Sequence, residues 1–349
     1  MAKSPPPPPT RKATGLPGDL RAFEVANLLN QATSFFTTHQ FGKAARAAQE
    51  VLQRDAKQPM ALLLLGRIAQ QNRDWETAAS LYRRAVALSP KNANLHASLG
   101  AALIALGRRD EAAASFRRAK SLDPEHKLAS YMLGGLDGGS QAVQANFVRA
   151  MFDGYAPTFE KHLTETLGYR IPWIIAEAVV AAHRAPFAAV LDLGCGTGLI
   201  GDALPREQAP VIDGVDLSAR MVEITRGKGR YRAVVEGDIV QAMTAPEVSG
   251  AGYDLVAAAD VFIYVGALEA VFAKVHEILL PGGLFGFSLE HSDEDGVALQ
   301  ASSRYAHGAR YTAELAERSG FAPVLSQQMP LRQEGGRDIP GRVEIWRRG

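Results

Sequence analysis

The sequence predicts two parts of different fold class: an all-α array of helix pairs, then an α/β domain built on a mostly parallel sheet. Two observations predict this division. From about residue 25 the chain repeats itself with a period of 34 residues, which is typical of stacked helix pairs. Residues 188–198, Ala-Ala-Val-Leu-Asp-Leu-Gly-Cys-Gly-Thr-Gly, form an apolar run ending in glycines, as a buried parallel strand does before a tight turn.

Composition bounds the class of protein. Of 349 residues, 47% are hydrophobic and 21% are charged, which is ordinary for a water-soluble globular protein. No apolar run approaches the roughly 18 residues of a membrane span, and the start of the chain carries no apolar leader. Cys195 is the single cysteine, which excludes an intramolecular disulfide and predicts a reducing, cytoplasmic location. We expect neither a metal nor a nucleic-acid partner, because metal-ligand spacings and aromatic-interleaved basic patches are missing.

Changes in composition give the domain boundaries. The first part carries an excess of basic residues and the second an excess of acidic ones, so the two parts are electrostatically distinct. A proline run and Gly138-Gly139-Ser140 punctuate the ends of the repeat region. The predicted parts are a disordered Pro-rich tail at 1–20, a repeat domain at 21–137, and a second domain at 141–349 with a helical lid at 141–187 and a sheet at 188–349.

The repeat has a recognisable internal pattern. The matching positions are Ala44, Ala78 and Ala112; the Leu-Gly pairs at 65–66, 99–100 and 133–134; Tyr82 and Phe116; and Pro90 and Pro124. The pattern resembles the tetratricopeptide repeat, which implies one helix pair per repeat, crossing closely at the small residues. A first, degenerate repeat at about 25–58 precedes two clear ones, and a helix at 128–136 is expected to seal the stack. Such an array implies a protein partner or self-association, and both remain open.

The glycine-rich turn predicts a binding site. Gly194, Gly196 and Gly198 remove every β-carbon where a ligand must approach the backbone. Asp192 adds a negative charge at the carboxyl end of the strand, which suits a ligand that carries both an ammonium and a carboxylate. The class of the ligand remains open at this point, because Gly196-x-Gly198-x-x-Gly201 also fits the pattern of a dinucleotide-binding turn. In that case Asp216 is placed to hold the ribose of NAD.

Residues 192–198, Asp-Leu-Gly-Cys-Gly-Thr-Gly, resemble the first motif of the class I methyltransferases that use S-adenosylmethionine. The downstream segments extend the resemblance, because Gly237-Asp238-Ile239 follows the third strand and the chain ends on two strands joined by a Gly-rich turn. The dinucleotide fold normally lacks that last antiparallel strand. The resemblance therefore implies a Rossmann-like α/β methyltransferase domain, which has a seven-stranded, mostly parallel sheet with an antiparallel last strand. An all-α solenoid precedes this domain along the chain. It also implies S-adenosylmethionine as the cofactor.

The elements of this domain follow from the apolar runs and turn signals. Strands are expected at 188–193, 211–216, 231–235, 253–259, 284–289, 324–332 and 343–347, and helices at 172–183, 199–204, 268–280 and 311–319.

The resemblance also implies residue roles. Asp216 would accept both ribose hydroxyls, Asp238 would accept from the adenine amine, and Ile239 would cover the ring. Tyr155 lies in an aromatic and acidic stretch, 152–160, which resembles the opening of one subset of these enzymes, and it would reach the amino-acid end of the cofactor. The predicted cofactor-binding residues are Tyr155, Asp192, Gly194, Cys195, Gly196, Asp216, Leu217, Met221, Gly237, Asp238, Ile239 and Asp260.

Methyl transfer is an in-line displacement that depends mainly on positioning, and a base is needed only if the acceptor begins protonated. The predicted catalytic residues are His307, Asp260, Tyr264 and His291, with Glu290 and Tyr311 also near the crevice. His307 is favoured because it lies in a polar and aromatic loop after the fifth strand. Arg304 and Arg310 either hold a substrate carboxylate or pair with the acidic residues at 293–295.

No motif names the methyl acceptor, so a small molecule and a peptide or protein both remain open. The rival function is a repeat-based adaptor whose second domain binds the cofactor without turnover.

Overall fold

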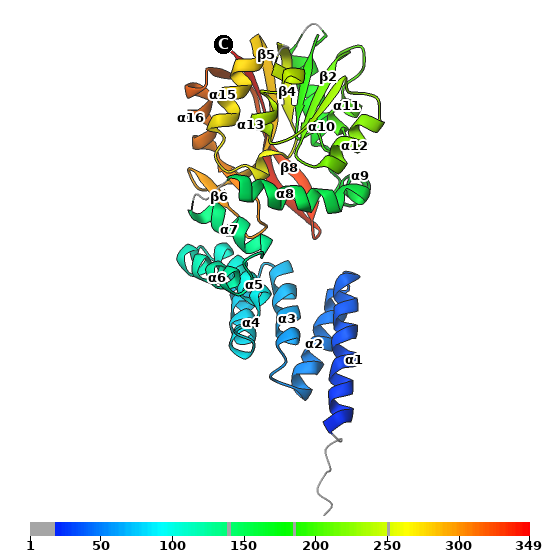
Figure 1. The fold of residues 1–349 in the computed structure, drawn as a ribbon, viewed down its shortest axis with the longest axis vertical. Helices are drawn as coiled ribbons and strands as arrows, with labels where there is room; N and C mark the ends of the chain where they lie inside the picture. Colours follow the sequence, from blue (N-terminus) through cyan, green and yellow to red (C-terminus); the bar gives the residue numbers. More distant parts are fainter. Residues whose placement is uncertain (1–17, 138–140, 184–185, 250–251) are drawn as a thin grey trace, which may run out of the picture. The chain divides into compact units, whose positions relative to one another are not determined.

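The computed structural model describes residues 18–137, 141–183, 186–249 and 252–349 (Figure 1). The chain folds into two compact units, Met1–Leu106 and Gly107–Gly349. The unit boundary therefore falls inside the repeat region. Most of the predicted tail and the predicted boundary at 138–140 lie outside the described residues.

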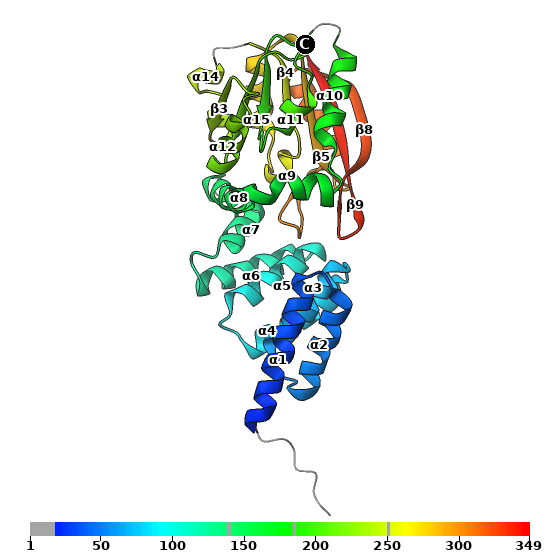
Figure 2. The same cartoon turned by 90° about the vertical axis from the view of Figure 1, so that its right-hand side faces the viewer.

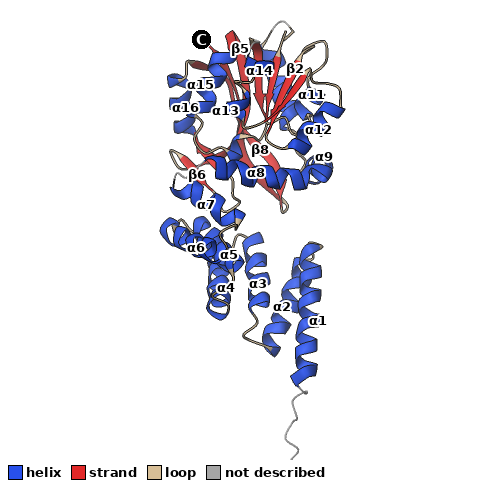
Figure 3. Cartoon of the chain, viewed as in Figure 1, coloured by secondary structure: helices blue, strands red, loops and turns tan. Residues whose placement is uncertain are grey.

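The described part of the first unit is helical throughout (Figure 3). Its helices are α1 (Gly18–Thr37), α2 (Phe41–Arg54), α3 (Pro59–Gln71), α4 (Trp75–Leu88) and α5 (Ala93–Ala105). Side-chain caps start two of them, because Asp74 accepts from the backbone N–H of Thr77 and Asn92 accepts from that of Leu95.

The glycine of the repeat allows the close helix crossing that the repeat pattern predicts. Gly66 of α3 faces Tyr82 of α4, and a β-carbon on Gly66 would lie 2.4 Å from Tyr82 Cε1. Tyr82 is fully buried, and its hydroxyl donates to Gln70 Oε1 over 3.0 Å. The glycine thus allows the two helices of one repeat to cross closely around the aromatic ring.

The second unit begins with helices that carry on from the repeats: α6 (Arg109–Leu122), α7 (Lys127–Asp137) and α8 (Gln141–Tyr155). The expected sealing helix at 128–136 is α7. It packs on α8 through Tyr131 and Phe147, whose ring centroids are 4.5 Å apart. Short segments then lead to the sheet: η1 (Ala156–Thr158), α9 (Phe159–Lys161), the π-helical η2 (His162–Thr166) and α10 (Ile171–Ala182).

Nine strands form the sheet of the described residues. They are β1 (Val190–Leu193), β2 (Ile212–Asp216), β3 (Ala233–Glu236), β4 (Tyr253–Ala258), β5 (Leu279–Ser292), β6 (Val297–Leu299), β7 (Tyr305–Gly308), β8 (Phe321–Glu334) and β9 (Arg337–Arg348).

The main sheet has the strand order β3-β2-β1-β4-β5-β9-β8. Strands β1 to β5 all run parallel to one another. Strand β9, the last strand of the chain, runs antiparallel to β5. The predicted seven-stranded, mostly parallel sheet with an antiparallel last strand is confirmed. Because β1 lies between β2 and β4, the strand order reverses there, and ligands of open α/β sheets bind at such a point.

Two features differ from the prediction. Strand β5 begins at Leu279, five residues before the strand predicted at 284–289, and has an irregular register against β4 between Tyr253 and Leu255. The segment expected to be a loop around His307 forms the hairpin β6–β7, and β7 pairs with the end of β5.

Helices cover both faces of the sheet (Figures 1 and 2). One face carries α15 (Glu269–Ile278) and α16 (Ala309–Arg318), and the other carries α10 and α11 (Leu199–Ala203). The other short elements are α12 (Ala219–Gly227), α13 (Ile239–Ala242), α14 (Pro246–Ser249) and η3 (Phe262–Tyr264). Helix α8 lies across the carboxyl ends of the parallel strands. Among the helices of the described residues, none is long and apolar enough to cross a membrane.

Candidate functional site

The turn after β1 brings backbone into the site. Gly194, Gly196 and Gly198 have φ angles of 62°, 54° and 88°, a region that residues with a β-carbon rarely adopt. A β-carbon on Gly194 would lie 2.6 Å from Val261 Cγ2, so the segment after β4 packs directly on this turn. Helix α11, which follows, has only five residues. The wall here is therefore loop backbone.

Asp192, at the end of β1, is 1% exposed. The hydroxyl of Tyr231 donates a 2.6 Å hydrogen bond to Asp192 Oδ2 and accepts one from the N–H of Gly201. Burial raises the pKa of Asp192 to about 8, although the Tyr231 hydrogen bond acts in the opposite direction. A cation placed beside this carboxyl would favour its ionised form. The site is thus suited to an ammonium group.

Asp216 ends β2 and ties two loops together. Its Oδ2 accepts from the N–H of Gly196 and its Oδ1 from that of Ser218, both over 2.8 Å. Burial raises its pKa, against these backbone hydrogen bonds. The Ser218 side chain accepts from the N–H of Met221 and so caps the start of α12. This arrangement leaves both carboxylate oxygens with further lone pairs at the edge of the cavity.

Helix α8 is hydrogen-bonded to the loop that follows β2, next to Asp216. Arg149 donates to the carbonyl oxygen of Leu217 over 3.1 Å. The hydroxyl of Ser218 donates to Asp153 Oδ1 over 2.6 Å. Two contacts therefore hold the lid helix on the loop after β2.

Asp238 and Ile239 follow β3. The Asp238 side chain caps α13, because its Oδ1 accepts from the N–H groups of Val240 and Gln241. Both bonds go to the same oxygen, so Oδ2 is available to another donor. Ile239 is 8% exposed and begins α13. The N–H of Gly237 donates to the carbonyl oxygen of Asp216, which joins β3 to the end of β2.

Two small polar side chains lie in the glycine turn. Cys195 is buried as a free thiol, and burial raises its pKa well above the usual value. Thr197 is 2% exposed, and its hydroxyl has no hydrogen-bond partner within the described residues. A buried hydroxyl without a partner is costly, and this one borders the cavity.

Tyr155 ends α8 and belongs to an aromatic cluster. Its hydroxyl is hydrogen-bonded to His162 Nδ1. Its ring lies 5.1 Å from that of Phe159, which lies 5.9 Å from Phe152. Phe152 in turn packs edge-on against Tyr264 of η3, with ring centroids 5.3 Å apart. The lid therefore contacts the segment after β4 as well as the loop after β2.

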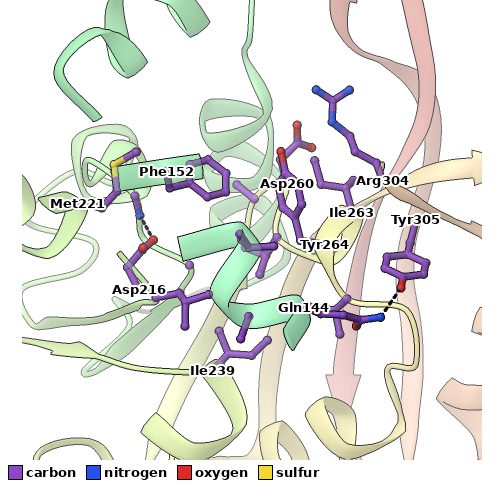
Figure 4. Close-up of a pocket in the computed structure, with 18 of the residues that line it drawn as sticks. Gln144, Phe152, Asp216, Met221, Ile239, Asp260, Ile263, Tyr264, Arg304 and Tyr305 are labelled. Atoms are coloured by element: carbon purple, nitrogen blue, oxygen red, sulfur yellow. Dashed lines mark hydrogen bonds between the residues drawn. The ribbon is translucent and has the colours of Figure 1, made fainter. Parts of the chain in front are cut away.

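These groups surround a cavity of about 780 Å³, within the range of small-molecule and cofactor sites. Figure 4 shows Asp216 and Met221 on one side of it and Gln144 and Tyr305 on the other, with Tyr264 between them. The predicted residues that line the cavity are Tyr155, Asp192, Gly194, Cys195, Gly196, Asp216, Leu217, Met221, Asp238, Ile239, Asp260 and Tyr264. Gly237, His291 and His307 do not belong to this lining.

His307, the favoured base, lies outside the cavity lining. It lies in β7 with no exposed surface. Its Nε2 donates to the carbonyl oxygens of Val265 and Gly266, over 3.1 and 2.9 Å. Burial lowers its pKa to about 4. His307 thus fastens the segment after η3 to the hairpin.

His291 is also turned away from the cavity lining. Its Nε2 pairs with the exposed carboxylate of Asp293 over 3.1 Å. Arg310 pairs with Asp295 and Glu314 on the surface. Of the two roles predicted for Arg310, the structure therefore shows pairing with an acidic residue at 293–295. Tyr311 does line the cavity, but its hydroxyl is used by the Leu268 N–H and by Glu269.

A buried ionic cluster, which the sequence analysis did not assemble, lies beside Asp260. The guanidinium of Arg332 contacts Asp260 Oδ2 at 2.8 Å, Glu334 Oε1 at 2.7 Å, and Glu290. Arg304 pairs with Glu334 and lies 3.8 Å from Glu290. We call these five residues the ionic cluster.

Asp260 is further engaged by its own loop. Its N–H donates to Ser288 Oγ, and Ser288 Oγ donates to Asp260 Oδ1. Asp260 is one of four non-glycine residues of the described chain with a positive φ, at 56°. Burial raises the pKa of the neighbouring Tyr264, so its hydroxyl stays protonated at neutral pH. Asp260 therefore holds the loop in place and carries an Arg332 contact rather than standing free as a base.

The sequence matches known families in the two parts that its patterns predict. Residues 190–283 match the family described as "Methyltransferase domain". Two tetratricopeptide repeat families match residues 29–93 and 69–136.

Among curated proteins, a sterol 24-C-methyltransferase of Clavispora lusitaniae is 31% identical over 103 residues, covering 28% of this chain and 26% of that protein. That of Yarrowia lipolytica is 32% identical over 107 residues, covering 29% and 27%. The chain thus spans about a quarter of the length of these relatives.

Solved structures with a similar fold include the magnesium protoporphyrin IX methyltransferase of Synechocystis PCC 6803 with bound S-adenosylmethionine. It has a TM-score of 0.44 at 17% identity and covers 59% of this chain and 97% of that chain. The [4+2]-cyclase SpnF gives a TM-score of 0.47 at 17% identity, with 58% and 96% covered.

The chain therefore combines N-terminal tetratricopeptide repeats with a C-terminal class I methyltransferase domain. S-adenosylmethionine is the cofactor that this domain implies. The residues present fit such a group. The glycines of the turn carry no side chain that would keep a ligand from the backbone. A cation beside the buried carboxyl of Asp192 would favour its ionised form, and the Thr197 hydroxyl has no hydrogen-bond partner within the described residues.

Proposed function

We propose that this chain is an active S-adenosylmethionine-dependent methyltransferase. The observation that carries the proposal is the convergence of Asp192, Asp216 and Asp238, from the ends of three neighbouring strands, on one cavity beside the glycine turn. Three acids in that order match the three chemically different parts of the cofactor: ammonium, ribose and adenine.

In this proposal the chain's residues bind and orient. Asp192 and the turn at 194–198 hold the amino-acid end, and Asp216 accepts the ribose hydroxyls on the lone pairs that its backbone bonds leave. Asp238 Oδ2 accepts from the adenine amine while Ile239 packs on the ring. The cofactor supplies an electrophilic methyl group on a sulfonium.

The chain's contribution to the chemical step is then positioning and exclusion of water. The lid of Phe152 and Tyr155 covers the reacting region, and Tyr264 and the loop of Asp260 border it. The engagement of Asp260 by Arg332, and the burial of His307, favour an acceptor that needs no strong base from the protein.

The repeats are proposed to bind a protein partner or a second copy of the chain, as tetratricopeptide arrays do. The sterol acceptors named for the curated relatives do not extend to this chain, because the similarity covers 28–29% of it.

The test is methyl transfer from tritiated S-adenosylmethionine into a cell extract, with Asp216→Asn as the control. Label that depends on the wild-type protein supports turnover. Binding of S-adenosylhomocysteine without transfer into any extract fraction would favour the rival, a repeat-based adaptor with a cofactor-binding domain.

A further inference from the structure

The side of the cavity away from Asp216 has mostly apolar walls, and we call it the chamber. Side chains from three parts of the fold form its walls: Val148 of α8, Ile263 and Val265 around η3, and Val297 and Leu299 of β6. Val148, Ile263 and Leu299 are each less than 9% exposed. Helix α7 contributes backbone at Gly134 and Gly135. The chamber therefore favours an apolar occupant.

The uncharged polar groups of this chamber are few. Gln144 Nε2 donates a 2.9 Å hydrogen bond to the hydroxyl of Tyr305 (Figure 4). The pair then offers one acceptor, Gln144 Oε1, and two donors, the Tyr305 O–H and the second N–H of Gln144 Nε2. If the amide were turned, the pair would offer the two N–H groups of Gln144 and the oxygen of Tyr305. Burial raises the pKa of Tyr305, so the hydroxyl keeps its proton.

The charged side chains that border the cavity are occupied elsewhere or exposed. Arg304 and Arg332 are paired within the ionic cluster. Arg109 and Glu269 line the cavity but are exposed to solvent. Among the described side chains of this chamber, a charged acceptor would therefore meet no buried charge that lacks a partner.

This polar inventory decides between the two acceptor classes. Each residue of a peptide brings a backbone N–H and C=O that must find partners, and burying them unpaired is costly. Two donors and one acceptor can satisfy a single hydroxyl or carbonyl group, but not the backbone of a peptide. We propose that the methyl acceptor is a small, largely apolar molecule with one such group, which binds Gln144 and Tyr305. This inference rests on the proposed methyl transfer.

The last repeat helix makes one wall of this chamber. A β-carbon on Gly135 would lie 2.6 Å from the Tyr305 hydroxyl and 2.7 Å from Leu299 Cδ2. The backbone of α7 therefore packs directly against β6 and β7. The repeat match at residues 69–136 includes both Gly134 and Gly135. A helix of the repeat array thus shapes the side of the cavity that holds Tyr305.

Two positions on α8 allow a matched test. Ala145 lines the chamber, whereas Ala150 is exposed and lies outside the lining. Ala145→Phe would fill the chamber, and Ala150→Phe is the same change on the solvent side of the same helix. Tyr305→Phe removes only the hydroxyl. Calorimetric titration with S-adenosylhomocysteine is run on every variant, and we expect unchanged affinity in all of them.

The full-length protein is incubated with tritiated S-adenosylmethionine and a cell extract, which is then split into an organic-solvent extract and an acid-insoluble protein pellet. We expect label in the organic extract. Ala145→Phe should lower it by about tenfold or more, as overpacking does, and Tyr305→Phe by roughly three- to tenfold. Ala150→Phe should leave it unchanged.

Label in the protein pellet instead, or full organic labelling by Ala145→Phe, would overturn the small-molecule inference and leave methyl transfer standing. Label in neither fraction, while S-adenosylhomocysteine still binds, would count against methyl transfer itself and remove the inference with it.

Discussion

The carboxylate of Asp216, at the end of β2, accepts a 2.8 Å hydrogen bond from the backbone N–H of Gly196, in the turn after β1. One side chain thereby fixes two loops at the point where the strand order reverses. Because the same carboxylate faces the cavity, the geometry of the glycine turn and the position of the predicted ribose site depend on one residue.

The first prediction concerns the pH dependence of cofactor binding. Burial raises the pKa of Asp192 to about 8, so below that pH the carboxyl must lose its proton to face a ligand ammonium. We expect the affinity for S-adenosylhomocysteine to rise between about pH 6 and pH 8, by up to about tenfold per pH unit. Calorimetric titrations across this range measure it.

The control is Asp192→Asn, which should bind more weakly and with a flat profile over the same range. Wild-type affinity that does not change between about pH 6 and pH 8 would contradict the placement of the ammonium beside Asp192.

The second prediction concerns the ionic cluster. Arg332→Met leaves the carboxylates of Asp260, Glu290 and Glu334 without their shared partner in a buried site. We expect the free energy of unfolding to fall by about 3–5 kcal/mol, measured by urea denaturation. Because protonation relieves the repulsion, the loss should be smaller at about pH 5 than at about pH 8.

Arg310→Met, which removes exposed pairs on the surface, is the matched control and should leave the denaturation midpoint unchanged. Equal effects of the two substitutions would show that the cluster contributes no more than a surface pair.

The third prediction concerns His307. Its pKa is lowered to about 4 by burial, so the unfolded chain binds more protons than the folded one between about pH 4 and pH 6.5. Stability is therefore lost as the pH falls through this window. The stability advantage of wild type over His307→Gln should shrink by up to about 3 kcal/mol across it.

Chemical denaturation at several pH values measures this difference in the free energy of unfolding. The carboxylates present in both proteins contribute equally to each value, so their contribution cancels in the difference. An advantage that stays constant down to about pH 4 would mean that His307 is not buried as a neutral side chain. Loss of methyl transfer in His307→Gln with unchanged stability would restore it as a catalytic candidate.

The fourth prediction compares two adjacent glycines of α7. A β-carbon on Gly135 would lie 2.6 Å from the Tyr305 hydroxyl, whereas one on Gly134 would lie 3.4 Å from Gln144. Gly135→Ala should lower the free energy of unfolding by about 1–2 kcal/mol, because overpacking exceeds the gain in helix propensity. Gly134→Ala should be neutral or stabilising by up to about 1 kcal/mol.

Thermal unfolding of the two variants provides the comparison. Equal stability would contradict the close packing of α7 on the β6–β7 hairpin.

Much of the fold could be predicted because its signals are local. The period of 34 residues and the apolar runs before glycine or aspartate follow from the geometry of stacked helix pairs and buried parallel strands. The β6–β7 hairpin could not be predicted, because its seven residues are short segments without clear alternation. Their burial comes from packing against β5 and α7, which the sequence does not display.

The same distinction holds for the site. Asp192, Asp216 and Asp238 were predictable, because each lies within two residues of the end of a strand and parallel strands bring such residues to one edge. The ionic cluster was not, since Arg332 and Asp260 are 72 residues apart and meet only through the pairing of β8, β9 and β5. His307 was predicted as a base from its polar neighbours, but its burial in β7 depends on the same tertiary contacts.

The central claim is most directly tested by calorimetric titration of the full-length protein with S-adenosylhomocysteine, with NAD as the control ligand and Asp216→Asn as the control protein. We predict S-adenosylhomocysteine affinity on the order of micromolar, no binding of NAD, and loss of binding in the variant. Absence of S-adenosylhomocysteine binding, or affinity that survives Asp216→Asn unaltered, would contradict the site described here.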